Sequence, residues 1–157
     1  MLERVDDVAK AAKDGYTLLW AISNHVTNPL LFKRVPYDPI RDFTPIAVIG
    51  YAPYMLVVNP NLPVTSLKEF VEYVKARPGL VPYASAGHGH GSHLGMELLR
   101  GMAGLSMVHV PYKGGAPAIN DLLGGQVNVL LFPASDVLAH VKAGRLRALA
   151  VTTQQRV

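Results

Sequence analysis

The feature that most constrains the fold of this chain is the alternation of short apolar runs with helix-forming segments over residues 55–151. The apolar runs are too short for helices and are bounded by turn residues, as buried strands are. Strands that alternate with helices are joined by right-handed crossovers and form a sheet covered on both faces. The sequence therefore predicts an α/β fold with a doubly wound, mostly parallel sheet.

The individual elements follow from local patterns. Ser66 and Glu69 form a capping box, which starts a helix that Pro78 and Gly79 end. The predicted strands are residues 16–21, 46–49, 55–58, 80–84, 107–110, 127–132 and 146–151. The other predicted helices lie before Gly15, from Gly91 to about Gly101, and at residues 116–123 and 135–143.

Composition excludes several classes of protein. The 157 residues match the size of one ordinary globular domain, and half of them are apolar. Without cysteine there is no disulfide framework, thiolate metal site or cysteine nucleophile. The net charge of +4 comes from scattered Lys and Arg, which argues against nucleic-acid binding. No apolar run reaches the roughly 20 residues of a membrane-spanning helix, and the first fifteen residues do not resemble a secretory signal.

The glycine-rich run between Ala84 and Leu94 is the most informative local motif. It follows a predicted strand and opens a helix, where unpaired backbone N–H groups favour an anion. Gly87 allows close approach of a ligand, and Ser85 and Ser92 offer hydroxyl groups. The glycine spacing fits neither common nucleotide motif. We expect free amides at residues 91–94 to form one wall of a small-anion site; the alternative is a flexible turn with no ligand.

Three histidines in the same run raise the possibility of a zinc site. His88, His90 and His93 lie within six residues, but glycines between them would leave such a site poorly held, and no HExxH helix accompanies them. We therefore expect His88 and His90 to face solvent without metal. A serine–histidine hydrolase using Asp121 or Asp136 would need a geometry that the sequence does not reveal, so we expect no enzyme activity and no cofactor.

Several segments together resemble the Bug family, the extracytoplasmic solute receptors of tripartite tricarboxylate transporters. The segments are residues 14–19 (DGYTLL) with Asn28-Pro29, 31–43 (LFKRVPYDPIRDF), 83–94 (YASAG ending in SHL), 107–114 (MVHVPYKG), 121–127 (DLLGGQV) and 142–152 (KAGRLRALAVT). Their order and spacing agree with the family over nearly the whole chain. The resemblance implies a periplasmic-binding-protein-like fold of two lobes.

The resemblance also implies a function. Such receptors are periplasmic, close over a small carboxylate or dicarboxylate, and deliver it to the membrane components of the transporter. Carried over by position, the implied ligand-binding residues are Ser23, Asn24, Ser85, Gly87, Ser92, His93, Tyr112, Phe132 and Ser135. Lys113 could flank the same cleft or be an exposed turn lysine.

The chain also departs from the family pattern. It starts on a helix and ends just after a strand, so we expect a piece cut at both ends, with residues 55–143 as a nearly complete second lobe. Residues 1–54 and 144–157 would be part of the first lobe. His88 and His90 occupy positions where small or amide residues are usual. Two alternatives stay open: a non-binding structural or assembly remnant that self-associates, and a His-dependent metal-binding hydrolase.

Overall fold

The computed structural model describes residues 2–154 and divides the chain into two compact units. The first unit comprises residues 1–50 and the second residues 51–157. No helix in the described part is both long enough and apolar enough to cross a membrane. Each unit is described by itself below.

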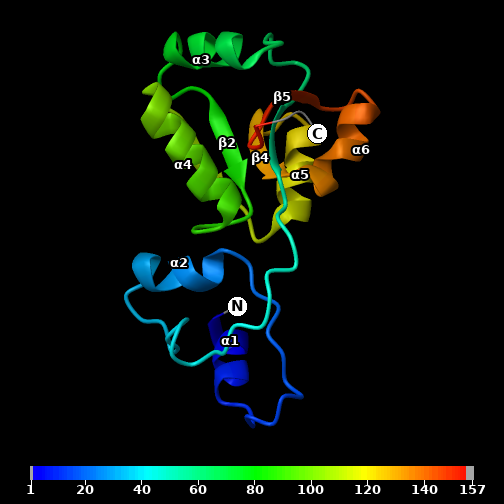
Figure 1. The fold of residues 1–157 in the computed structure, drawn as a ribbon. Coiled ribbons are helices and arrows are strands. Elements are labelled where there is room, and N and C mark those ends of the chain that lie inside the picture. The colour runs from blue at the N-terminus through cyan, green and yellow to red at the C-terminus, as the bar shows by residue number, and fades with distance from the viewer. Residues whose placement is uncertain (1, 155–157) are drawn as a thin grey trace. The chain divides into compact units, whose positions relative to one another are not determined.

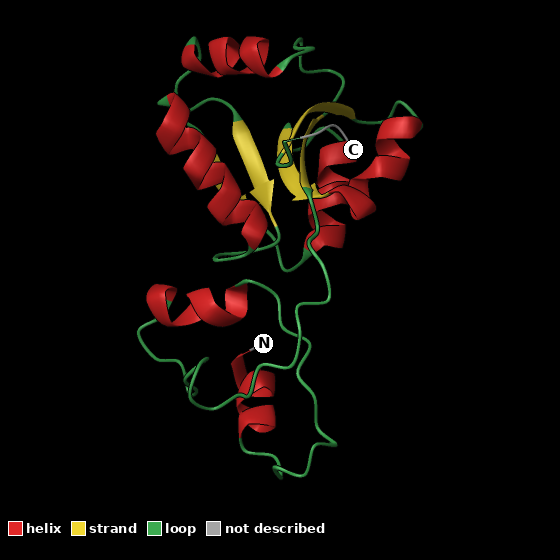
Figure 2. Cartoon of the chain, viewed as in Figure 1, coloured by secondary structure: helices red, strands yellow, loops and turns green. Residues whose placement is uncertain are grey.

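The second unit is built on a five-stranded sheet in the order β3-β2-β4-β1-β5 (Figures 1 and 2). The strands are β1 Tyr54–Val58, β2 Pro82–Ser85, β3 Val108–Pro111, β4 Val129–Pro133 and β5 Arg147–Val151. β2 runs parallel to β3 and β4, whereas β1 runs antiparallel to β4 and β5. Four strands therefore share one direction and β1 opposes them. The predicted α/β class and mostly parallel sheet are confirmed.

Helices cover both faces of this sheet, α4 on one side and α5 and α6 on the other (Figure 1). The helices of the second unit are α3 Leu67–Lys75, α4 Gly91–Ala103, α5 Gly115–Leu123 and α6 Ala134–Lys142. In β1, Leu56 and Val58 join the core on the α4 side, while Met55 and Val57 join the core on the α5 and α6 side. Period-two alternation thus gives β1 two buried faces.

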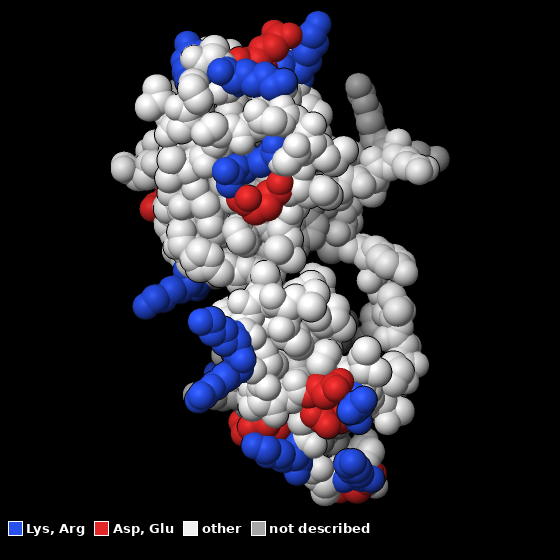
Figure 3. Space-filling view, turned by 90° about the vertical axis from the view of Figure 1, so that its left-hand side faces the viewer, with Lys and Arg blue, Asp and Glu red and all other residues white. Residues whose placement is uncertain are grey.

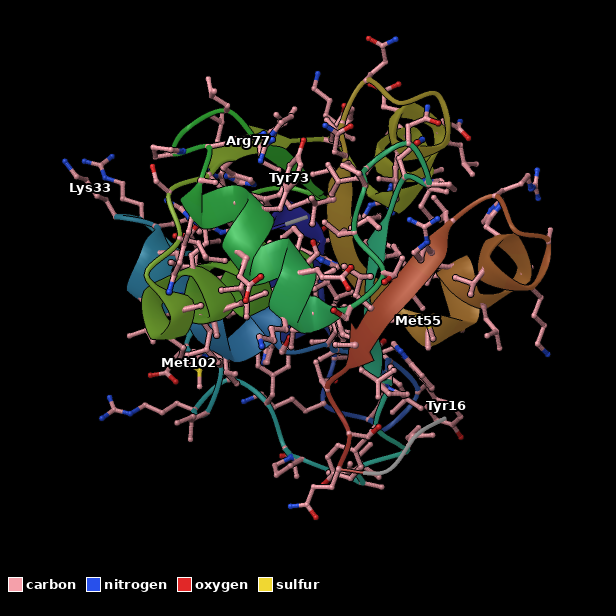
Figure 4. All side chains as sticks on the ribbon, turned by 90° about the horizontal axis from the view of Figure 1, so that it is seen from above. Tyr16, Lys33, Met55, Tyr73, Arg77 and Met102 are labelled. Atoms are coloured by element: carbon pink, nitrogen blue, oxygen red, sulfur yellow. The ribbon has the colours of Figure 1, made fainter. Side chains whose placement is uncertain are left out.

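The capping box before α3 is formed in a modified way. The Ser66 hydroxyl accepts a hydrogen bond from the Glu69 amide at 3.2 Å, as predicted. The Glu69 carboxylate accepts instead from the amide of Thr65 at 2.7 Å and from its hydroxyl at 2.9 Å. These bonds hold the pKa of Glu69 below its usual value. Beyond the helix, the Arg77 guanidinium lies 4.0 Å from the centre of the Tyr73 ring. Figure 4 labels both residues, which lie close together.

The first unit is held together by a small aromatic and amide cluster. The first unit contains helices α1 Leu2–Ala9 and α2 Asn24–Leu31. The His25 ring stacks on Tyr37 with centroids 5.3 Å apart, and the Phe43 ring meets both edge-on. Buried Asn28 donates to the Tyr37 hydroxyl at 3.0 Å. These few contacts fix the position of α2 against residues 37–43.

Two strands predicted in this unit do not form. Residues 16–21 and 46–49 are irregular, and Tyr16, which protrudes in Figure 4, is 91% exposed. A strand needs a neighbour to take its backbone hydrogen bonds, and no described segment pairs with either run. Ser23 and Asn24, expected in a loop, instead form the N-cap and first residue of α2.

Residues 144–154 pack with the second unit of this chain, and their expected membership of the first lobe stays a prediction. β5 pairs with β1 from Met55↔Val151 to Val58↔Arg147. Just beyond β5, the Thr152 amide donates to the Tyr54 carbonyl at 2.9 Å. These backbone bonds place residues 144–154 in the second unit, together with Tyr54, and not with residues 1–50; residues 155–157 lie outside the described residues.

Candidate functional site

The candidate site lies at one edge of the sheet in the second unit. β3, β2 and β4 are neighbours and parallel, so their carboxyl ends meet at the same edge. Each of these strands leads through a short connection into α4, α5 or α6. In open α/β sheets, ligands bind outside the carboxyl ends of the strands, where the helix amino ends also gather.

Two buried serines organise the connection between β2 and α4. Ser85 Oγ accepts from the Gly87 amide at 3.1 Å and lies 2.6 Å from His109 Nε2. Ser92 Oγ accepts from the Ala86 amide at 3.0 Å. Both serine side chains are fully buried. These hydroxyls therefore shape the loop from within, and their role in ligand binding stays a prediction.

His90 has a structural role that the sequence did not reveal. Its Nδ1 accepts from the Ser92 amide at 3.1 Å, which makes it the side-chain cap of α4. The same ring stacks on Phe132 with centroids 5.7 Å apart. Burial lowers the pKa of His90, which favours the neutral ring that this cap requires. The expectation that His90 faces solvent is therefore wrong, whereas exposure of His88 is confirmed.

Three other imidazoles gather beside this cap. The His109 ring, from β3, lies between Tyr83 and His93, with centroids 4.9 and 4.2 Å away and planes within 16° of parallel. The His88 ring meets both His93 and His109 edge-on. Burial and the neighbouring imidazoles lower the pKa of His109 to about 4. Burial also lowers the pKa of His93, so both rings are neutral near pH 7.

A carboxylate lies behind this stack. Glu97 on α4 accepts hydrogen bonds from the Tyr83 hydroxyl and from the Arg100 guanidinium. Burial raises the pKa of Glu97, but these two bonds outweigh it and hold the pKa below its usual value. Burial and the Glu97 carboxylate raise the pKa of Tyr83. The trio fixes the Tyr83 ring, against which His109 stacks.

Three of the four amides expected to be free at the start of α4 are already hydrogen-bonded. The amides of His93 and Leu94 donate to the His90 carbonyl, and that of Ser92 donates to the His90 ring. By contrast, the amino ends of α5 and α6 carry no side-chain cap. The helix amino ends without a side-chain cap at this edge are therefore those of α5 and α6, and at α6 the Ala134 amide donates to the Pro53 carbonyl at 2.8 Å.

The other predicted residues are distributed as follows. The Tyr112 amide donates to the Ser85 carbonyl at 2.9 Å, and its hydroxyl donates to Asp121 at 2.6 Å. Burial and this Asp121 bond raise the pKa of Tyr112 to about 12. Phe132 is buried, and Ser135 is exposed on the first turn of α6. Ser23 and Asn24 lie in the first unit, so their role in binding stays a prediction.

Close backbone approach occurs at Gly87, where the structure requires glycine. Its φ of +122° is a conformation that other residues rarely adopt. A Cβ atom there would also lie 3.1 Å from the Tyr112 carbonyl oxygen. Gly87 therefore lets the β2–α4 connection pack closely against the β3–α5 connection, and it contributes to the site through its backbone.

The sequence analysis missed His109 as a site residue. His109 lies in the segment MVHVPYKG. Nothing in the local sequence distinguishes a functional histidine in a strand from one that is simply packed in the core. The parallel register pairs His109 with Tyr83, two residues before Ser85 on β2. Only that pairing brings the ring to the glycine-rich loop.

The face of the molecule drawn in Figure 3 shows no continuous basic patch among the described residues. On the face in Figure 3, Lys and Arg side chains are interspersed with Asp and Glu and separated by uncharged areas. A nucleic-acid site normally shows a continuous basic patch.

Comparison with known proteins identifies the family. The model of the tripartite tricarboxylate transporter family receptor matches residues 4–157. The chain belongs to this receptor family. Its members are binding receptors and not enzymes, in agreement with the expectation from the sequence.

Individual relatives of this receptor chain support the same assignment. Protein BugT of Bordetella pertussis is 39% identical over 153 residues, which cover 96% of this chain and 47% of BugT. A solved R. palustris protein, Rpa4515 with adipate, superposes with a TM-score of 0.92 at 38% identity, over 99% of this chain and 52% of that protein. The periplasmic binding protein BugD superposes with a TM-score of 0.90 at 35% identity, over 99% of this chain and 52% of BugD. The chain thus spans about half the length of these relatives.

Proposed function

We propose that this chain is part of a solute receptor that captures a small organic carboxylate for tripartite tricarboxylate-type uptake in the periplasm. The observation that carries the proposal is the meeting of three strand-to-helix connections at one sheet edge, with the amino ends of α5 and α6 uncapped. Helix amino ends bind carboxylates through backbone N–H groups and the helix dipole. The adipate bound to the R. palustris relative is of this chemical class.

The side chains around this edge suit a carboxylate of low charge. The rings of His93 and His109 are neutral near pH 7, and Lys113 is an exposed cation in the β3–α5 connection. Carboxylate binding would therefore rest on backbone amides, neutral donors and one mobile charge. This combination favours mono- and dicarboxylates over more highly charged anions, because fewer cations are available to balance them.

The first test is a calorimetric titration of the chain with adipate, malate, citrate and a monocarboxylate such as acetate. We expect saturable binding of at least one dicarboxylate. A bound ligand stabilises the folded state by about 2.7 kcal/mol at one hundred times its Kd, so thermal unfolding gives a second readout. Failure of every carboxylate to bind or to raise the unfolding temperature would contradict the proposal for this chain.

A substitution at α6 makes the test specific. Ser135→Asp places a negative charge at an uncapped helix amino end, where it stabilises the helix but repels a bound carboxylate. We expect it to weaken binding more than tenfold without lowering the unfolding temperature. Asparagine has nearly the same shape as aspartate but no charge, so Ser135→Asn should retain most of the affinity for the carboxylate. Equal affinity of the two variants would place the carboxylate elsewhere.

We also propose that copies of this chain associate through the first unit. Tyr16, Leu18 and Trp20 are exposed at alternate positions, as are Ile46 and Val48. Exposed apolar segments of this kind associate with other chains. Light scattering over a dilution series should give a mass above that of one chain, and Leu18→Ser with Trp20→Ser should lower it. A monomer at every concentration would rule this out.

A further inference from the structure

The three imidazoles of His88, His93 and His109 form a cluster whose joint arrangement the proposed function does not require. One ring nitrogen of each lies within 4.8 Å of the corresponding nitrogens of the other two. His88 and His93 come from the β2–α4 region and His109 from β3, so the fold brings together residues that are distant in the sequence. The cluster differs from the His88, His90 and His93 trio considered from the sequence, because His90 is committed to capping α4.

We propose that His88, His93 and His109 bind one divalent transition-metal ion of the zinc class. Zinc takes imidazole nitrogens at about 2.0–2.1 Å and binds three histidines with a fourth position open. The nitrogens must therefore draw together from their present separation. His88 allows this, because its side chain is exposed and flanking Gly87 and Gly89 both have positive φ.

The surroundings of His109 suit a metal ligand. Ser85 Oγ lies 2.6 Å from His109 Nε2 and 3.3 Å from the Gly87 carbonyl oxygen; when the hydroxyl donates to that carbonyl, it accepts the proton on His109 Nε2. That arrangement leaves the Nδ1 lone pair of His109 free. A ligating histidine commonly donates its other N–H to a fixed acceptor, which sets the tautomer and the ring orientation. Buried Ser85 provides that acceptor here.

One existing hydrogen bond competes with metal binding. The Gly89 amide donates to His93 Nδ1 at 3.2 Å, and this bond must be given up when His93 ligates a metal through either nitrogen. Gly89 has a φ of +76° in a glycine-rich loop, so the amide can turn away. The rearrangement involves the loop alone, because Ser92 and His90 hold the start of α4 separately.

The test uses the chain prepared without a polyhistidine tag and dialysed against a chelator. Titration with Zn²⁺ should show one saturable site, and Mg²⁺ should not compete, because imidazole suits transition metals and not hard cations. His88→Asn should weaken Zn²⁺ binding by more than about 100-fold, since even the loss of an outer hydrogen-bond partner typically costs 10–100-fold. Because His88 is exposed, this variant should fold normally.

His90→Asn is the matched control. It removes a histidine from the same loop but keeps a side chain that can cap α4, so Zn²⁺ affinity should stay within about threefold, a difference smaller than 1.4 kcal/mol. NMR gives an independent readout: of the six histidines, the ring signals of His88, His93 and His109 should shift with one equivalent of Zn²⁺. No saturable binding, equal loss in both variants, or shifts at His90 or His140 instead would overturn the proposal. The test contains no carboxylate, so its outcome is separate from that of the solute titration.

Discussion

The two units of this chain have similar apolar patterns but differ in how much of the pattern is buried. In the second unit, Val57, Phe70 and Met96 are completely buried between the sheet and its helices. In the first unit, Leu18 and Trp20 are 67% and 75% exposed in an irregular segment. The difference teaches that an alternating apolar run becomes a strand only where another strand accepts its backbone hydrogen bonds.

Truncation of a core side chain should give the largest difference between the two units in the free energy of unfolding. Phe70→Ala removes a fully buried ring and should lower the free energy of unfolding of the second unit by about 3–5 kcal/mol. Leu18→Ala in the first unit should change it by less than about 0.5 kcal/mol, because that side chain is mostly exposed. Urea unfolding followed by circular dichroism measures both. Comparable losses would mean that residue 18 is buried in solution.

Replacement of glycine by alanine, which adds one methyl group, should give smaller differences in stability. A Cβ atom at Gly115 would lie 2.4 Å from Phe132 Cζ, so Gly115→Ala should destabilise the second unit by about 1–3 kcal/mol through overpacking. Gly50 has open space around it, and Gly50→Ala should be nearly neutral. Gly101→Ala, also in open space but inside α4, should stabilise by up to about 1 kcal/mol. Thermal unfolding of the three variants would refute this order if Gly115→Ala were the most stable.

The two serine N-caps offer a finer comparison. Ser66 accepts the Glu69 amide, and Ser66→Ala should destabilise α3 and the second unit by about 1 kcal/mol. Ser23 occupies the N-cap of α2 without a side-chain cap bond, so Ser23→Ala should have almost no effect. Hydrogen exchange of the first-turn amides reports on each helix separately. Faster exchange in α2 after Ser23→Ala would show a cap that the structure lacks.

The smallest expected effect concerns two exposed carboxylates. Hydrogen bonds from Thr65 lower the pKa of Glu69, and those from the Arg41 and Ile40 amides lower the pKa of Asp38. A lowered folded pKa stabilises above the unfolded value, and this stabilisation is lost as pH falls through the folded pKa. Glu69→Gln should therefore lower the unfolding temperature slightly at pH 7 but not at the acid end of the titration. NMR titrations should place both carboxyls below their usual pKa; ordinary values would remove the expected pH dependence.

Much of the second unit was predictable from local patterns. The strands and helices of residues 54–151 agree with the predicted order, since their apolar runs and turn residues are explicit in the sequence. The Ser66 cap was predicted because its partner lies only three residues away. The reversed direction of β1 was not predicted, because strand direction depends on which connection crosses the sheet.

The sequence by itself determined the α/β class, the family, and the loop that leads into α4. Tertiary structure alone decided which groups of that loop are free. The side chain of His90 accepts from the Ser92 amide, which was expected to bind an anion, while the pairing of β3 with β2 carries His109 to His93. The physical reason is that local chemistry fixes which atoms can form hydrogen bonds, but only the packed chain decides which partner each one meets.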